Sequence, residues 1–511
     1  MAPSANPIPR RPPARHRAGF AAVLLALGAV FGGCTTVGPD FRPPAVDAPP
    51  DWSARHGGDP SLAADGSAGD GLPANRWEVF ADPTLARLQG TAMRANADVR
   101  SATLHVLQSR AEQAMVSAQR GVQVGARGGV SRQRQSETGS GARLVSAIGG
   151  PNEQALLDVL SAPFSLYEAG FDASWEPDLW GRVLRSEEAA QAGTDAQQAA
   201  RRQVQLSVAA EVARVYFALR LVQQQQVLLG DELTTGQETE TLLAALAGHG
   251  LADETALNRQ RQQLAVLQSL APTLRAQEAQ AMNRLTLLCG TEPGALNGLL
   301  AAPAAPPAAL PDLRLGLPAE LARRRPDIAA AEARLHAATA GIGIAVADLY
   351  PRVMLGASFG LESVDARSFG DWGSRQWGVG ASLNLPLFDH GRRKATITLR
   401  ELQQQEAAVA FQQTVLVAWH EVDDAISAYR AETQRQAQLT VRARSTGEDL
   451  ALAQARYANG MASYLPVLAA TATDLGARRD LAESRARAQT ALAALFKSLG
   501  DEGDAAALAS R

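Results

Sequence analysis

The clearest chemical signal in this 511-residue chain is Cys34, near its start. Arginines at positions 10, 11, 15 and 17 precede an unbroken apolar run, residues 18–31, and Gly32 and Gly33 separate that run from the cysteine. A basic region followed by a short apolar run is typical of a secretory signal peptide, and small residues before a cysteine resemble a lipobox, where the cysteine is acylated. We expect residues 1–33 to be removed and Cys34 to carry lipid. The alternative is ordinary cleavage beside an incidental cysteine.

Three other groups of reactive residues favour structural roles. Residues 356–360 read Gly-Ala-Ser-Phe-Gly, the spacing of a nucleophile elbow, but they lie in an alternating stretch with no helical run after it. Glu421, Asp423 and Asp424 cluster on one predicted helix without a histidine at ligand spacing, which favours a solvated or lumen-facing surface. Cys289 has no partner and is expected to be a small buried residue near a helix end. We predict no catalytic residue, no metal site and no cofactor.

The composition indicates a folded protein with extended helices. Hydrophobic residues make up 46% of the chain and charged residues 20%, while the net charge of -3 gives no general reason to bind nucleic acid. Long stretches rich in Ala, Gln, Arg, Glu and Leu are typical of coiled coils. After Cys34 no run approaches the ~18 apolar residues of a membrane-spanning helix. If the mature chain crosses a membrane, strands must do so.

The chain is internally duplicated. Matching residues recur at an offset of 210, as in Gly250 with Gly460, where 460 - 250 = 210. The pairs Gly181 with Gly391, Gly290 with Gly500 and Arg220 with Arg430 keep the same offset. Upstream the offset is 229, between residues 98 and 327, so the halves differ mainly in one intervening loop. Each half is expected to contain a helix, a β-hairpin, a long helix and return helices.

The predicted hairpins show the period-2 alternation of strands with one apolar face. The four runs are residues 122–130, 167–175, 352–361 and 376–385; their apolar positions include Val122, Val124, Ala126, Val130, Tyr167, Phe171, Val353, Leu355, Phe359, Trp377, Val379 and Leu383. Lipid on one side and water on the other would explain the pattern, and so would a half-buried soluble sheet. If these strands span a membrane, four cannot close a sheet, because about 8 are needed, and the sheet must be shared between chains.

Each hairpin precedes a long helical stretch. The first extends from about Glu187 to Ala247, which at ~1.5 Å per residue reaches roughly 90 Å. Its apolar positions step by four and three, the spacing of a coiled-coil seam: Val204, Val208, Val212, Val215, Leu219 and Val222. Turn signals end the two long stretches at residues 248–250 and 459–460.

Four segments carry a resemblance to a known family. They are residues 34–44 (Cys-Thr-Thr-Val-Gly-Pro-Asp-Phe-Arg-Pro-Pro), residues 175–182 (Trp-Glu-Pro-Asp-Leu-Trp-Gly-Arg), residues 325–328 (Arg-Pro-Asp-Ile) and residues 385–392 (Leu-Pro-Leu-Phe-Asp-His-Gly-Arg). They resemble, in the same order, segments of the TolC/OprM (NodT-type) outer-membrane efflux lipoproteins. The resemblance implies an α+β membrane protein of the TolC-like trimer fold, in which a shared twelve-stranded outer-membrane β-barrel is continued by a periplasmic α-helical barrel.

The expected organisation of the chain follows from these patterns. It comprises a signal peptide (1–33), a lipid-anchored extended tether (34–80), a first repeat (81–292), a proline-rich equatorial linker (293–325), a second repeat (326–500) and a C-terminal tail (501–511).

By resemblance the protein is a passive exit duct for small toxic compounds in the outer membrane. Its implied partners are two further copies of itself, a periplasmic adaptor (membrane fusion protein), an inner-membrane RND-type pump and outer-membrane lipid. A duct for type I protein secretion and a lipid-tethered periplasmic coiled-coil scaffold are the alternatives. The apolar strand faces disfavour the scaffold, and selection of the exported compound is expected to lie in the pump.

The resemblance also implies a closed periplasmic mouth. Relatives have a leucine, an aspartate four residues later and an arginine three beyond that, and the matching positions here are Leu465, Ala469 and Ala472. We predict a gate formed by a ring of Leu465, with weak cation selectivity, and treat nearby Asp253, Glu254 and Asp474 as ordinary solvated residues near helix ends. The helix tips expected to contact the adaptor comprise Gly250, Leu251, Ala252, Gly460, Met461, Ala462 and Ser463.

Overall fold

A computed structural model describes residues 35–45, 52–53, 76–139, 143, 145, 147, 150, 153–301 and 324–500. The predicted signal peptide, Cys34, most of the proline-rich linker and the C-terminal tail lie outside the described residues, and the predictions made for them stay predictions.

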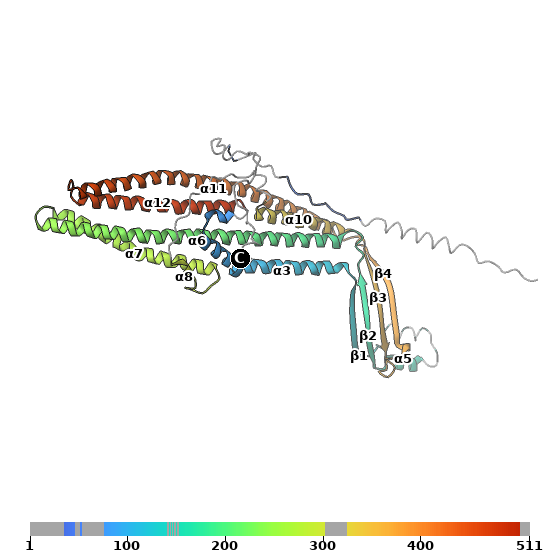
Figure 1. The fold of residues 1–511 in the computed structure, drawn as a ribbon. Coiled ribbons are helices and arrows are strands. Elements are labelled where there is room, and N and C mark those ends of the chain that lie inside the picture. Colours follow the sequence, from blue (N-terminus) through green and yellow to red (C-terminus); the bar gives the residue numbers. More distant parts are fainter. Residues whose placement is uncertain are drawn as a thin grey trace, which may run out of the picture. The chain divides into compact units, whose positions relative to one another are not determined.

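Two long helices of equal length dominate the chain (Figure 1). Helix α6 (Arg182–Gly248) and helix α11 (Arg392–Ala458) each contain 67 residues and begin 210 residues apart. Each turns back into a shorter helix, α7 (Glu254–Leu288) or α12 (Leu465–Ser498), so that two antiparallel helical hairpins result. The predicted duplication is therefore present in the fold, with the expected constant offset.

The offset is also visible in the backbone at three pairs of glycines with left-handed conformations. They are Gly181 and Gly391 (φ +75° and +84°), Gly250 and Gly460 (φ +70° and +71°), and Gly290 and Gly500 (φ +62° and +73°). Side chains with a Cβ rarely adopt this region. The duplicated glycines thus mark the starts and ends of the duplicated helices.

Helix α6 begins five residues before the predicted Glu187. The Asp178 carboxylate accepts the backbone amide of Leu184 at 2.8 Å and so satisfies one of the free donors of the first turn. An aspartate six residues before its target is not the usual capping spacing, and the sequence therefore did not reveal the true start.

The shorter elements complete the two halves. They are η3 (Arg76–Phe80), α2 (Pro83–Ala95), α3 (Ala97–Ser117), η4 (Ala118–Arg120), α5 (Glu153–Ser161), α8 (Asn297–Leu300), α10 (Pro326–Ala347) and η5 (Trp372–Ser374). Helix α2 shows why a helix starts where it does: Asp82 accepts the amides of Thr84 and Leu85 at 2.9 and 3.1 Å, and Pro83 has no amide that needs an acceptor.

The four strands form one antiparallel sheet in the order β1 (Gln123–Gln133), β2 (Phe164–Trp175), β3 (Arg352–Ser363) and β4 (Arg375–Asn384). The pairing of β2 with β3 joins the hairpin of the first half to that of the second. Among the described strands, β1 and β4 are the two edges of the sheet.

Burial is concentrated where the helical hairpins meet α2 and η3. Phe80, Phe217 and Phe496 are almost fully buried and their rings contact one another, with centroids 4.9 Å apart for Phe80 and Phe217 and 6.0 Å for Phe80 and Phe496. Burying each ring contributes roughly 1.5 to 3 kcal/mol. The predicted seam of α6 enters this core: Val208, Val212, Val215 and Leu219 are buried.

Cys289 is buried in the same core, and its thiol lies 3.6 Å from the Leu88 carbonyl. Burial raises the pKa of the Cys289 thiol to about 11, so the reactive thiolate is disfavoured at neutral pH. This agrees with the predicted structural role.

The described chain comprises two compact units. Of the described residues, one unit contains those within 35–42, 110–192 and 336–405, and the other contains those within 43–109, 193–335 and 406–500. Within the described part of the chain, every helix is too short or too polar to cross a membrane.

Candidate functional site

The ends of α6 and α11 are built in the same way. The Leu251 amide donates to the Leu246 carbonyl (2.8 Å), and the Met461 amide donates to the Arg456 carbonyl (2.9 Å), each reaching back five residues. The preceding left-handed glycine donates three residues back in both cases, at 2.9 Å. This is the Schellman motif, which satisfies the last helix carbonyls and reverses the chain. A side chain at Gly250 or Gly460 would meet no atom within 4 Å, so the backbone angle alone explains these glycines.

A large apolar side chain projects from each tip. Leu251 is 75% exposed and Met461 is 70% exposed, although the residue after a Schellman glycine commonly packs on its own helix. Ala252 and Ala462 beside them are half-buried, and Ser463 is exposed. The predicted tip residues are thus at the two hairpin ends, and two of them leave apolar surface uncovered in the single chain.

The predicted gate residues lie on one face of α12. Leu465 is its first residue, and Ala469 and Ala472 follow at the spacing that keeps side chains on one helix face. With Leu468 and Gly476 they line a hollow of about 330 Å³ between α12 and the α6–α7 hairpin. Leu465, Ala469 and Ala472 are all exposed in the single chain.

Charged groups missed by the sequence prediction line the same hollow. Arg479 donates to both carboxylate oxygens of Glu232 on α6, at 3.1 and 3.3 Å, and Glu232 is only 10% exposed. Arg479 lies fourteen residues, or two heptads, after Leu465. The heptad spacing therefore puts it on the same face of α12 as the predicted gate residues. Its partner is distant in sequence, and only the fold identifies it.

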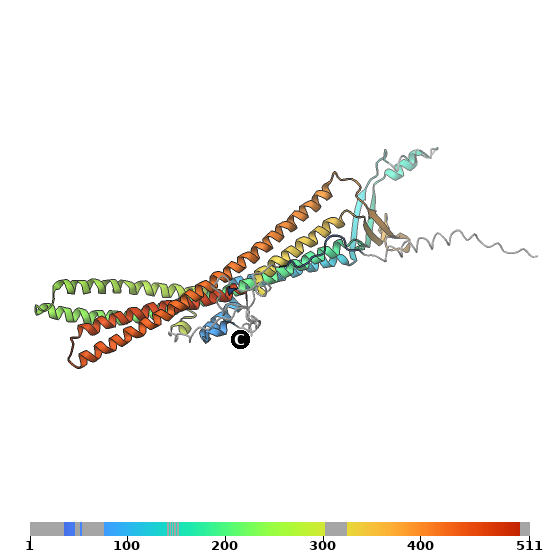
Figure 2. The same ribbon diagram turned by 90° about the horizontal axis from the view of Figure 1, so that it is seen from above.

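Two further polar links join the hairpins, which lie side by side in both views (Figure 1, Figure 2). The Tyr464 hydroxyl donates to Glu238 at 3.2 Å, and the Gln225 amide donates to Glu483 at 3.1 Å. The hydrogen bond to Glu238 raises the pKa of Tyr464. The pairing of α12 with α6 near the tips is therefore polar, in contrast to the aromatic core.

The acidic residues near the tips have different roles. Asp253 accepts the Thr255 amide at 3.1 Å and begins α7, as expected for an ordinary helix end. Asp474, which we predicted to be solvated, is instead 2% exposed; it accepts Arg478 at 2.7 Å and the Thr446 hydroxyl at 3.2 Å. The prediction was wrong because the partner, Thr446, lies on the other arm of the α11–α12 hairpin.

The sheet presents one exposed apolar face. In the register, Phe171 lies opposite Phe359, which lies opposite Trp377, and these three side chains are 61%, 50% and 73% exposed. The other face carries small and polar residues. At its centre, Gly170 and Gly360 face each other so closely that a side chain at Gly170 would come within 2.9 Å of the Gly360 Cα. The alternation predicted from the sequence is present, and large apolar side chains lie on the face left exposed in one chain.

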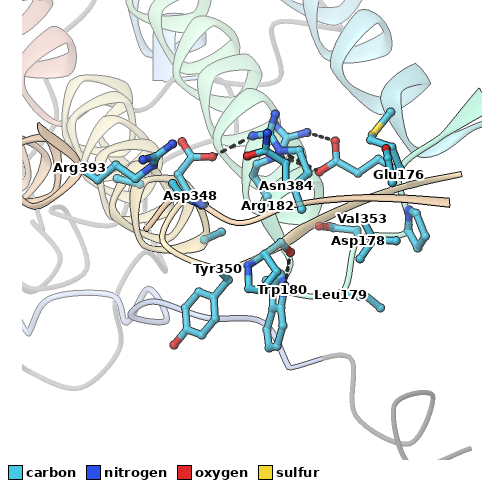
Figure 3. A pocket seen from close by; sticks show the side chains of 18 of the residues that line it. Glu176, Asp178, Leu179, Trp180, Arg182, Asp348, Tyr350, Val353, Asn384 and Arg393 are labelled. Carbon is cyan, nitrogen blue, oxygen red and sulfur yellow. Dashed lines mark hydrogen bonds and ion pairs between the residues drawn. The ribbon is translucent and has the colours of Figure 1, made fainter. Parts of the chain in front are cut away.

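A polar hollow of about 690 Å³ lies where the strands join α6, α10 and α11 (Figure 3). Arg182 donates to both carboxylate oxygens of Glu176 at 3.1 and 2.9 Å, and Arg352 pairs with Asp348 at 3.0 Å. Two-pronged arginine–carboxylate pairs fix orientation well. The first pair therefore holds the end of β2 on the first turn of α6, and the second joins the start of β3 to the residue that follows α10.

The remaining candidate residues from the sequence lie within a strand or form an ion pair. Ser358 lies within β3, paired between Asp172 and Gly378, and not at a strand–helix turn. Glu421 is 53% exposed, as expected for a solvated or lumen-facing surface, and it also accepts Arg325 at 2.6 Å. In the part of the chain that the structure describes, no three His, Cys, Asp or Glu side chains gather as metal ligands would.

Comparison with known proteins agrees with this architecture. A family model described as outer membrane efflux protein matches residues 88–291 and 317–501. The outer membrane protein OprJ of Pseudomonas aeruginosa is 32% identical over 95% of this chain and 96% of its own length, and the solvent efflux pump outer membrane protein SrpC of Pseudomonas putida is 29% identical over 92% and 96%. The solved structure of the outer-membrane channel OprN superposes with a TM-score of 0.77, with 29% identity over 91% of this chain and 98% of that chain.

Proposed function

Because the chain belongs to the outer membrane efflux protein family, we propose that three copies of it form a passive exit duct for small toxic compounds across the outer membrane. The protein is an outer-membrane channel component of a tripartite efflux system. Beyond this role, we propose the number of copies, the position of the gate and the docking surfaces.

The exposed apolar face of the sheet carries the proposal. Strands with large apolar side chains on one face and glycine, serine and charged residues on the other suit lipid outside and water inside. Phe171, Phe359 and Trp377 would face lipid. A four-stranded sheet leaves β1 and β4 with unpaired backbone groups, which is costly in lipid. Three copies would supply twelve strands and pair every edge.

The hollow around Leu465 supports the proposed gate. In a symmetric trimer the exposed face of α12 with Leu465, Ala469 and Ala472 would meet its copies at the axis, where apolar side chains close the mouth. The Arg479–Glu232 and Tyr464–Glu238 links would hold α12 against α6 in the closed arrangement. Opening requires these links to break.

The two hairpin tips support a contact with a periplasmic adaptor. Leu251 and Met461 occupy equivalent positions after their glycines and remain exposed. Three chains would present six such side chains, and a helical adaptor with small apolar contacts would cover them. The inner-membrane partner is proposed to be an RND-type pump.

Two measurements test the proposed function. The detergent-purified chain should have the mass of three copies, and a strain lacking its own exit ducts should regain export of a fluorescent dye when it expresses this chain with a compatible pump and adaptor. A stable folded monomer in detergent, or correctly inserted protein that never restores export with any such pump, would refute it.

A further inference from the structure

The apolar face of the sheet carries two arginines, and both lie on its edge strands. Arg132, near the end of β1, follows Ala126 by six residues, and Arg375, the first residue of β4, precedes Trp377 by two. An even spacing along a strand keeps side chains on one face. In the register, Ala126 and Trp377 belong to the same row as Phe171. Both arginines therefore share the face of the large apolar side chains.

The acidic residues of the sheet are on its other face. The described strands contain three carboxylates, Glu168, Asp172 and Glu362, and each is an odd number of residues away from Phe171 or Phe359. The apolar face of the four described strands thus carries positive charge and no negative charge.

Both arginines lie at the end of the sheet that is farther from the helices. β1 follows η4 and β4 precedes α11, so the helices join the sheet where β1 begins and β4 ends. At that end the apolar face carries Val124 on β1 and Leu383 on β4, and at the opposite end it carries Arg132 and Arg375. In the proposed outer-membrane duct, the end with the arginines reaches the outer leaflet.

Neither arginine is neutralised within the described part of the chain. The Arg375 guanidinium lies over the Trp372 ring, 4.5 Å from its centroid, and donates to the Trp372 carbonyl at 2.6 Å. Arg132 is exposed and has no hydrogen bond or ion pair with any described residue. By contrast, the neighbouring Arg134 pairs with Glu137 at 2.5 Å. The charges of Arg132 and Arg375 are therefore available to a ligand.

Closure of the sheet between copies would bring these charges together. β1 and β4 are the two edges and run in opposite directions. Pairing of β1 with β4 of the next copy puts the end of β1 beside the start of β4, at the usual strand spacing of about 4.8 Å. Arg132 of one copy and Arg375 of the next would then lie near each other. Like charges on adjacent strands repel, and a bound anion would turn this repulsion into attraction.

We propose that each border between two copies binds a phosphate group of an outer-leaflet glycolipid, held between Arg132 of one copy and Arg375 of the next. This rests on the proposed function, because the site exists only where three chains close one sheet. Guanidinium groups bind phosphate through paired hydrogen bonds, and the outer leaflet of an outer membrane consists of phosphorylated glycolipid. Trp372 beside Arg375 is exposed, and tryptophan is enriched at the level of lipid headgroups.

The experiment uses the full-length protein, purified as a trimer in detergent, and diphosphorylated lipid A as the probe. Native mass spectrometry should show three tightly bound glycolipids on the wild-type trimer. Arg132→Gln and Arg375→Gln should each weaken binding by about tenfold, through the loss of one charge-assisted contact. Arg127→Gln is the matched control, because Arg127 lies on β1 but on the opposite face, and it should bind like the wild type.

Mixed trimers test whether the two arginines come from different copies. When Arg132→Gln and Arg375→Gln chains with different tags are co-expressed, every mixed trimer has one border with both arginines, one with a single arginine and one with neither. Mixed trimers should therefore bind one glycolipid with wild-type affinity. Trimers of either variant alone have a single arginine at each border and should bind none that tightly.

Equal binding by mixed and unmixed variant trimers, or wild-type affinity in both single variants, overturns the proposal. Equally tight binding of dephosphorylated lipid A also overturns it, because the acyl chains alone would then be recognised. Displacement of the glycolipid by an equal concentration of inorganic phosphate would show a site for the free ion instead and has the same consequence. A trimer that restores dye export but binds no glycolipid refutes this proposal alone, whereas a chain that forms no trimer refutes the proposed function as well.

Discussion

The Tyr464 hydroxyl donates to the Glu238 carboxylate at 3.2 Å and so ties the residue just before α12 to the part of α6 near the tip of the other helical hairpin. Fifteen residues after Tyr464, Arg479 of α12 donates to Glu232 of α6. Both links cross from one hairpin to the other beside the proposed gate, and neither belongs to the aromatic core. They are the contacts that a moving α12 would have to break first.

Arg479→Gln should loosen the closed mouth more than Tyr464→Phe does. Glu232 is nearly buried, so removal of its arginine leaves an unpaired carboxylate and costs about 1 to 3 kcal/mol. The Tyr464 link is exposed and contributes about 1 kcal/mol or less. Single-channel recording in planar bilayers should show a higher resting conductance for Arg479→Gln than for Tyr464→Phe. The opposite order, or no change in either variant, would contradict the role given to these links.

Leu465→Ser should clearly raise the resting conductance, because a ring of serines cannot exclude water as leucines do. Ala469→Asp lies one turn along the same face and is the matched comparison: conductance should stay low while preference for cations increases, since carboxylates attract them. If Leu465→Ser conducts like the wild type, the gate lies elsewhere on the chain.

Adjacent residues of β4 offer a test of the lipid face. Leu383→Arg places a charge on the apolar face and should reduce trimer yield, at a cost of about 2 to 4 kcal/mol near the membrane midplane. Ser382→Arg points to the opposite face and should be far milder. Phe171→Arg on β2 should behave like Leu383→Arg. Trimer amounts in detergent gels measure the effect, and equal yields for Ser382→Arg and Leu383→Arg would exclude a lipid-facing role for the apolar side.

Lipid attachment and sorting can be separated with two substitutions. Radiolabelled palmitate should enter the wild type and not Cys34→Ala. Thr35→Asp should still be labelled but should remain in the inner membrane, because an acidic residue after the cysteine is associated with retention there. Equal labelling of wild type and Cys34→Ala would remove the lipid anchor from this protein.

Residues 36–41 are held by the buried Arg185, which donates to the Val37 carbonyl and pairs with Asp40 and Glu188. This network should be sensitive to acid. Burial alone would raise the pKa of Glu188, but hydrogen bonds and charges from Arg185 and His336 outweigh it and lower that pKa below its ordinary value of 4.5. A lowered pKa means that its contribution to stability is present above pH 4.5 and is lost as the pH falls further. The Val37 amide donates to the Trp180 carbonyl, and its protection from exchange, relative to the intrinsic rate at each pH, should therefore fall below pH 4.5 in the wild type. In Glu188→Gln this protection should depend less on pH. Identical profiles would show that Glu188 does not help to hold residues 36–41 in place.

Local patterns in the sequence predicted the helices and strands. The sequence analysis missed the side-chain partners that lie far apart along the chain. The offset of 210, the strand alternation and the seam through Val212 are local or periodic, and all appear in the fold. The partner of Asp474 lies across a hairpin, and the partner of Arg479 lies on the other half of the chain, 247 residues away. Periodicity shows which face a residue occupies and does not show what faces it.

Residues 36–41 illustrate the same limit. The sequence predicted an extended tether over residues 34–80, because that stretch is rich in proline and glycine. Arg185, which fastens it, lies 145 residues from Asp40 and is one of many arginines at helix starts. The glycines gave the one available signal, because Gly343 inside a helix marks a close approach that only a backbone can make.

Helices α6 and α11 have the same length, and this restricts how the chain can change in evolution. A seven-residue insertion in one helix alone would keep its seam in phase but displace one hairpin tip by ~10 Å relative to the other. Leu251 and Met461 would then no longer reach a common surface. Insertions and deletions in these helices are therefore expected to occur as matched pairs, one in each repeat, whereas the connection between β1 and β2 differs in length from the one between β3 and β4.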